Sequence, residues 1–139
     1  MKFTAFFFLA MILTIGKPCC QIEQKAAKSV TIYMKKEFKK YKSLKFGKLF
    51  EQNYSTEIEK TLGTDKKVKY SIIHYYSLGK EERKDYFHLD KDLNVVGKLD
   101  FDQMMVITWE VLKKDKAFSK TLDSLGVDTN NIKFEEKKE

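Results

Sequence analysis

The sequence predicts an α+β fold, in which an N-terminal helix packs on an antiparallel sheet of three to four strands and further helices follow at the C-terminus. Residues 21–41 repeat apolar side chains at three- and four-residue steps, which is typical of one helix face. Residues 68–96 are rich in Val, Ile, Tyr and Phe between turn-forming residues, as strands are. Residues 100–125 return to helical spacing, and the length of 139 residues suits one domain.

The N-terminal segment has the pattern of a secretory signal. Lys2 precedes an apolar run at 3–15 that is broken only by two threonines. That run is shorter than the roughly 20 residues that a bilayer-spanning helix needs, but it matches the apolar region of a signal peptide. The predicted organisation is a signal peptide at 1–20, a single α+β domain at 21–126 and a polar C-terminal tail at 127–139.

The expected location is the periplasm, the cell envelope or the outside of the cell. Cleavage after Gly16 and cleavage near Cys20 both fit the sequence. Attachment of a lipid to Cys19 or Cys20 is less expected, because Pro18 and Cys19 stand where small residues would precede the modified cysteine. Adjacent cysteines seldom bridge, so no internal disulfide is expected in the mature domain.

The charge argues against nucleic-acid binding. The net charge of +7 falls to +5 once Lys2 and Lys17 are removed with the signal segment. Lysine supplies nearly all of it, Arg83 is the one arginine, and acids are interleaved along the chain. Base and phosphate readout favours clustered arginine forks. A weak attraction to an anionic membrane surface fits this composition better.

The first elements follow from local patterns. The helix at 21–41 carries lysines opposite its apolar face, so it could lie on a membrane, but packing on the strands that follow is favoured. A short strand is predicted at 42–47. A helix is predicted at 54–62, with Asn53 or Ser55 as the cap and Gly63 as the stop.

The middle of the chain predicts a hairpin. A strand at 68–78, a charged turn at 79–83 and a return strand at 84–90 are followed by a strand that begins at Val95 and ends near Gly97. The acids of residues 90–94 do not form an EF-hand loop, because the glycine and glutamate that such a loop requires are missing.

The C-terminal segment is less distinct. Residues 100–114 have the composition of a strand but the spacing of a helix, and a helix with Asp100 as its cap is predicted. A second helix is predicted at 116–125, with Gly126 as its stop.

Three pieces carry a resemblance: YKSLKFGKL at 41–49, the alternation Tyr70-x-Ile72-x-His74-x-Tyr76, and Phe87-x-Leu89-Asp90-Lys91. Over about half of its length the chain resembles small uncharacterised exported proteins of Bacteroidetes-type bacteria. The resemblance implies a helix followed by an antiparallel sheet, cystatin-like or NTF2-like in shape. It implies no activity.

The hairpin predicts a candidate site. A five-residue turn at 79–83 makes His74 face His88 across the two strands, and makes Tyr76 face Tyr86. These four side chains would share the outer face of the sheet. A shift of one residue would separate the two histidines. In the predicted register, the face toward the N-terminal helix carries Ile73, Tyr75, Phe87 and Leu89.

Three interpretations of this face remain open. It could bind a small molecule or a peptide on a concave sheet through His74, His88, Tyr76 and Tyr86. His74, His88 and Asp90 could hold zinc, although two histidines without a recognised motif are a weak signal. Tyrosine and histidine could also serve only as amphipathic cover of a half-exposed sheet.

The sequence carries no recognised catalytic pattern, whether GxSxG, P-loop, GxGxxG or HExxH. Ser71 and Ser77 point away from His74 on the predicted strand. The predicted function is therefore a non-enzymatic, exported binding or interaction module for a protein, a peptide or a small molecule, with no cofactor. The alternative is a small enzyme or a metal-binding protein that uses the His74/His88 face.

Overall fold

The computed structural model describes residues 18–128 and 131–132. The apolar core of the predicted signal peptide and most of the predicted tail lie outside the described residues. The elements in chain order are α1 (Pro18–Glu37), β1 (Tyr41–Glu51), α2 (Ser55–Leu62), β2 (Tyr70–Leu78), β3 (Glu81–Leu89), β4 (Val95–Asp100), α3 (Phe101–Leu112) and α4 (Lys116–Ser124).

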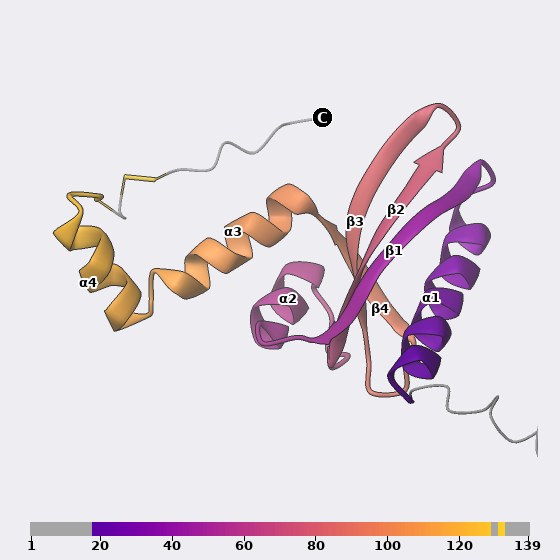
Figure 1. Ribbon diagram of the computed structural model, residues 1–139, viewed down its shortest axis with the longest axis horizontal. Coiled ribbons are helices and arrows are strands. Elements are labelled where there is room, and N and C mark those ends of the chain that lie inside the picture. The colour runs from indigo at the N-terminus through magenta and orange to yellow at the C-terminus, as the bar shows by residue number, and fades with distance from the viewer. Residues whose placement is uncertain (1–17, 129–130, 133–139) are drawn as a thin grey trace, which may run out of the picture.

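The fold is α+β, as predicted. Four antiparallel strands lie in the order β1-β2-β3-β4, so each strand pairs with its neighbour in the chain. Helix α1 covers one face of the sheet, and α2 and α3 lie on the other side (Figure 1). Helix α3 leads away from the sheet, and α4 lies beyond its end (Figure 1). Among the described residues, no helix combines the length and the apolarity that spanning a bilayer requires.

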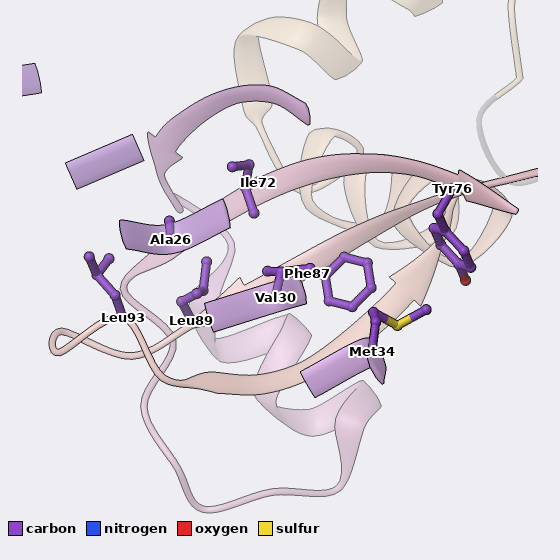
Figure 2. Packing of buried hydrophobic residues seen from close by; sticks show 8 residues of the cluster. All are labelled: Ala26, Val30, Met34, Ile72, Tyr76, Phe87, Leu89 and Leu93. Carbon is purple, nitrogen blue, oxygen red and sulfur yellow. The ribbon is translucent and has the colours of Figure 1, made fainter. Parts of the chain in front are cut away.

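The α1 layer forms the main core. Ala26, Val30 and Met34 recur at four-residue steps and are fully buried. Figure 2 shows them directed at the side chains of the sheet. Burial of each large apolar side chain contributes roughly 1.5–3 kcal/mol, so this stripe holds α1 in place. The sheet and loop residues of the cluster are Ile72, Tyr76, Phe87, Leu89 and Leu93.

A second, smaller core lies under α2 and α3. Ile58 of α2 and Met104 and Ile107 of α3 are buried with Val68 and Leu99. Strand β4 and helix α2 come into close contact at Gly97. A Cβ atom on Gly97 would lie 2.8 Å from Cδ2 of Leu62. The absence of a side chain at Gly97 therefore lets α2 sit directly on the strand.

The pairing of β2 with β3 differs from the prediction. The two strands are joined by Gly79 and Lys80 alone, and Gly79 has a φ of 67°. Positive φ at the first central residue is a feature of the tight type II′ hairpin turn. Residues 81–83 therefore belong to the sheet rather than to a five-residue turn. His74 pairs with Asp85, three residues away from the predicted partner His88.

An odd displacement exchanges the faces of one strand relative to the other, because side chains alternate along a strand, and here β2 presents the opposite faces to those predicted. The prediction that His74 and His88 share a face is therefore wrong. His74 and Tyr76 lie on the face toward α1, while Tyr86 and His88 lie on the opposite face. Phe87 and Leu89 are on the α1 side as predicted. Ile73 and Tyr75, which were predicted there, are on the other face.

Several element boundaries also move. Strand β1 spans 11 residues rather than the predicted 42–47, and α1 ends at Glu37 rather than at Tyr41. Strand β4 continues past Gly97 to Asp100. Helix α2 begins without a side-chain cap from either predicted residue. The helix predicted after Asp100 is confirmed, and Asp100 forms a capping box with Gln103.

Candidate functional site

His74 is fully buried on the sheet face that α1 covers. Its ring stacks on Phe46, with the centroids 3.9 Å apart. Nδ1 lies 3.1 Å from the carbonyl oxygen of Lys45, and Nε2 lies 2.7 Å from the hydroxyl of Tyr41. A carbonyl oxygen can only accept a hydrogen bond, so Nδ1 carries the proton. Nε2 therefore accepts from the Tyr41 hydroxyl.

Both ring nitrogens of His74 are thus occupied, and neither has a lone pair free for a metal ion. Burial lowers the pKa of His74, against smaller opposing effects of the Lys45 carbonyl and the Asp85 charge. The imidazole is therefore neutral near pH 7. In this arrangement His74 acts as a hydrogen-bonded core residue.

Tyr76 belongs to a buried polar cluster on the same face. Its hydroxyl donates to Oδ2 of Asp85 at 2.6 Å, and Nζ of Lys98 lies 2.6 Å from the same oxygen. Tyr76 and Asp85 are buried, and the Lys98 side chain is 27% exposed. Burial, followed by the hydrogen bond to Asp85, raises the pKa of Tyr76. The cluster joins β2, β3 and β4, so it links three strands across the sheet.

His88 lies on the opposite face and is also fully buried. Its Nδ1 is 2.7 Å from Oγ of Ser71. Nε2 of Gln52 donates to the same Oγ at 2.9 Å, while Oε1 of Gln52 accepts from the backbone N–H of Tyr54. The amide orientation of Gln52 is therefore fixed. The Ser71 hydroxyl accepts from Gln52 and has its own hydrogen left to donate to His88 Nδ1.

This arrangement leaves Nε2–H of His88 as a buried donor without a partner among the described residues. Burial lowers the pKa of His88 to about 4. A Ser–His pair at this distance has the contact of a nucleophile with its base. Ser71 is fully buried, however, and no carboxylate in the described part of the chain orients the imidazole. The pair therefore lacks the access to substrate and the orienting group that nucleophilic catalysis uses.

The contacts of Tyr86 and Asp90 also indicate structural roles. Tyr86 is half-buried and packs with the core under α2 and α3. Asp90 accepts hydrogen bonds from the backbone N–H groups of Asp92 and Asn94, which closes the loop before β4. Burial acts to raise the pKa of Asp90, but these hydrogen bonds and Lys91 outweigh it and lower the pKa. Among the described residues, no group of three or more His, Cys, Asp or Glu side chains is placed to hold a metal ion.

A different set of side chains gathers on the face opposite α1, beyond the core under α2. Lys45 of β1, Tyr75 of β2 and Lys84 of β3 pair directly across the sheet, and we call these three the Tyr75 row. The two Nζ atoms lie 5.9 and 5.6 Å from the Tyr75 ring centroid. Lys84 Nζ also lies 4.9 Å from the ring of Phe101, which is 44% exposed. Two ammonium groups and two aromatic rings thus share one accessible surface.

Neither lysine of the Tyr75 row forms an ion pair with any residue in the described part of the chain. The nearest acid by register on this face is Glu82, which pairs with Ser77 toward the hairpin tip. The surface can therefore attract an anionic group while it offers ring faces for apolar contact.

The sequence interpretation missed the Tyr75 row because it placed Tyr75 in the core. The feature of the sequence that could have revealed the row is the Gly79–Lys80 dipeptide, since a glycine at the first central position is typical of two-residue hairpin turns. A hairpin closed by this turn puts Lys84 opposite Tyr75 without further assumptions.

Comparisons of the chain with protein-family models, with curated proteins and with solved structures found no match.

Proposed function

We propose that the protein is an exported, non-enzymatic binding module that holds an acidic, partly apolar peptide segment on the Tyr75 row and Phe101. The observation that carries the proposal is the alignment of Lys45, Tyr75 and Lys84 across three strands, with Phe101 beside Lys84. A carboxylate of the peptide would lie between the two ammonium groups. An apolar side chain of the peptide would cover the rings.

The physical basis is a surface whose position is fixed by the sheet. Tyr75 is half-buried between two paired strands, so its ring is held in place before any ligand arrives. Aromatic side chains supply large contact areas at a low cost in conformational entropy. Lysines at the edge of such a contact add attraction and orientation more than raw affinity.

The proposed export rests on the apolar run at 3–15 after Lys2. Mass spectrometry of the protein recovered from the envelope and the medium tests it. We expect an N-terminus created after Gly16 or near Cys20, and an added lipid mass would instead identify the anchored form. A full-length chain that stays in the cytoplasm would contradict export.

We also propose the relationship to the small exported Bacteroidetes-type proteins with a cystatin-like shape. The packing of a single helix, α1, across a four-stranded antiparallel sheet supports this shape.

A displayed peptide library tests the binding function. Peptides selected on the purified protein should be enriched in Asp or Glu beside apolar residues. Tyr75→Ala should weaken their binding at least tenfold, because it removes the ring that both ammonium groups flank. The variant Lys45→Gln/Lys84→Gln should weaken binding and reduce its salt dependence.

Tyr54→Ala and Lys60→Gln/Lys66→Gln serve as matched controls, since these side chains lie outside the Tyr75 row. Selected peptides without acidic residues would contradict the proposal. Equal binding by the Tyr75→Ala variant would also contradict it.

The alternative, a metal-binding protein or small enzyme built on His74 and His88, lacks the geometry from which it was inferred. The two imidazoles lie on opposite faces of the sheet and both are fully buried. Zinc titration followed by thermal melting tests this alternative, because a ligand of the native state must raise its stability. We expect no rise in Tm at saturating zinc, and a clear rise would restore the metal hypothesis.

A further inference from the structure

The outward face of α1 carries a strip of exposed lysines around one exposed apolar residue. Lys25, Lys28, Lys35 and Lys36 are all exposed, and Ile32 lies among them with 59% of its surface open to solvent. These five residues, the α1 lysine strip, follow helical spacing and lie opposite the buried Ala26, Val30 and Met34.

The acids of α1 lie away from this strip. Glu23 comes three residues before Ala26, and Glu37 comes three residues after Met34, so helical spacing places both on the side of the buried stripe, with Glu37 exposed at the end of the helix. Within the described part of the chain, none of the four lysines forms an ion pair. The strip is therefore a region of uncompensated positive charge on a molecule whose other lysines are interleaved with acids.

We infer that the α1 lysine strip docks on the surface of an anionic phospholipid bilayer, with Ile32 inserted between the headgroups. Clusters of four to eight lysines on an amphipathic helix are the usual chemistry for such surfaces. An exposed apolar residue in the middle of the charges fits lipid, because it can reach the acyl boundary. It would gain nothing on a nucleic-acid backbone, where arginine forks would also be expected.

This docking leaves the proposed peptide surface free. Helix α1 covers one face of the sheet (Figure 1), and the strand register places the Tyr75 row on the other face. A bilayer beneath α1 therefore leaves Tyr75 and Phe101 facing away from the membrane. The inference is independent of the proposed peptide binding, because the two surfaces share no residue.

Vesicle binding tests the inference. The exported form of the protein is mixed with vesicles of phosphatidylcholine, with and without phosphatidylglycerol, and the bound fraction is measured by sedimentation at increasing salt. We expect binding to the anionic vesicles that falls as salt rises. A retained apolar N-terminal segment would bind both vesicle types alike, so the difference between them reports the charge contribution.

Two variants with equal net charge locate the contact. Lys28→Gln/Lys35→Gln/Lys36→Gln removes three lysines of the strip, whereas Lys60→Gln/Lys114→Gln/Lys120→Gln removes three exposed lysines, from α2, from the turn between α3 and α4, and from α4. Each lysine at an anionic surface strengthens binding by roughly fivefold, so the first variant should bind on the order of 100-fold more weakly. The second variant should bind within about threefold of the wild type. Thermal melting confirms that both variants stay folded.

The Ile32→Ser variant tests the insertion. It keeps every charge, so its binding should weaken severalfold while its salt dependence stays that of the wild type. Equal losses in the two lysine variants would show a general charge effect and overturn the inference. Equal binding to neutral and anionic vesicles, or tighter binding to duplex DNA than to anionic vesicles, would also overturn it.

Discussion

Among the described side chains, Nε2 of His88 is the buried polar atom that lacks a hydrogen-bond partner. An unpaired buried donor costs roughly 1–3 kcal/mol of stability. Ser71, which accepts from Gln52, satisfies Nδ1 on the other side of the ring, and Nε2 has no such partner. The protein therefore carries a destabilising group at the centre of its sheet, and that group can titrate.

Acid should destabilise the protein through His88. Its pKa is about 4 in the folded state, below the usual value of 6.5, so the unfolded chain binds the proton first as the pH falls. The free energy of unfolding should therefore decrease from about pH 6.5 down to about pH 4, by about 2 kcal/mol at pH 5. Urea denaturation at pH 7 and pH 5 measures this decrease.

The variant His88→Leu is the control, because it removes the titrating group at similar volume. Its loss of stability between pH 7 and pH 5 should be smaller than that of the wild type by about 2 kcal/mol. His74, whose pKa is also lowered by burial, remains in both chains and contributes equally. Identical losses in the two proteins would contradict the assignment to His88.

Lys98 should contribute more to the stability of the fold than its partly exposed position suggests. Lys98→Met leaves the buried Asp85 carboxylate with Tyr76 as its hydrogen-bond donor, so we expect the free energy of unfolding to fall by about 2 kcal/mol. Adding Asp85→Asn should recover part of this loss, since the asparagine carries no charge and can still accept from Tyr76. Chemical denaturation of the two single variants and the double variant gives the coupling energy.

Lys91→Met provides the comparison, because Lys91 and Asp92 form an ion pair with both side chains exposed. No measurable change in stability is expected there. A Lys98→Met variant as stable as Lys91→Met would show that the Asp85 charge does not need its lysine.

At the scale of elements, the features that depend on residues three or four positions apart were predicted well from the sequence. The stripe of Ala26, Val30 and Met34 and the Asp100 cap with Gln103 are local features, and both helices are confirmed. The extent of the strands was predicted less well. Residues 81–83 are charged and resemble a turn, but they extend the hairpin because their backbone pairs with 76–78. Strand pairing is set by the partner and not by composition.

The largest error, in the register between β2 and β3, came from predicting a five-residue hairpin loop where the structure has two residues. Gly79 adopts positive φ, which lets Leu78 pair with Glu81 directly. Periodicity alone could not distinguish this register from one displaced by three residues, because both leave alternating side chains on each face. The predicted site depended wholly on that choice, so the four predicted residues divided between two faces.

Gly79→Ala should lower the free energy of unfolding by about 1 kcal/mol, because alanine is disfavoured at a φ of 67°. Gly79→Asn should cost less, since asparagine tolerates this conformation better. Thermal melts of both variants show which of the two loses more stability. Lys80→Ala, at the other position of the turn, should leave Tm unchanged, and a larger loss there than at Gly79 would contradict the turn assignment.

At the scale of the molecule, the burial of a candidate residue depends on which helix covers its face. His74 is buried beside α1 and His88 on the side of α2 and α3, and no local pattern in the sequence assigns these helices to opposite faces. The Tyr75 row stays accessible, with Lys45 exposed and Tyr75 and Lys84 half-buried, and Phe101, the first residue of α3, lies beside Lys84. Such coverage follows from tertiary packing and not from the pattern of any single strand.

The position of the proposed cleavage should have little effect on the stability of the folded domain. Ala26 is the first side chain from residue 21 onward that is buried in α1, and Ile22 is 46% exposed. Chains that begin at Lys17 and at Gln21 should therefore unfold at the same urea concentration. Equilibrium denaturation of the two chains measures this, and a lower midpoint for the shorter chain would assign a stabilising role to residues 17–20.

The order of the strands has a consequence for the export that we propose. Each strand pairs with its neighbour in the sequence, and the loop between β2 and β3 is only Gly79 and Lys80. Sheets built from such local contacts fold faster than sheets that join distant segments. A chain exported in an unfolded form would have to cross the membrane before this hairpin closes. The speed of folding would then limit the yield of exported protein, and a variant that slows the closure of this hairpin would be exported more efficiently than the wild type.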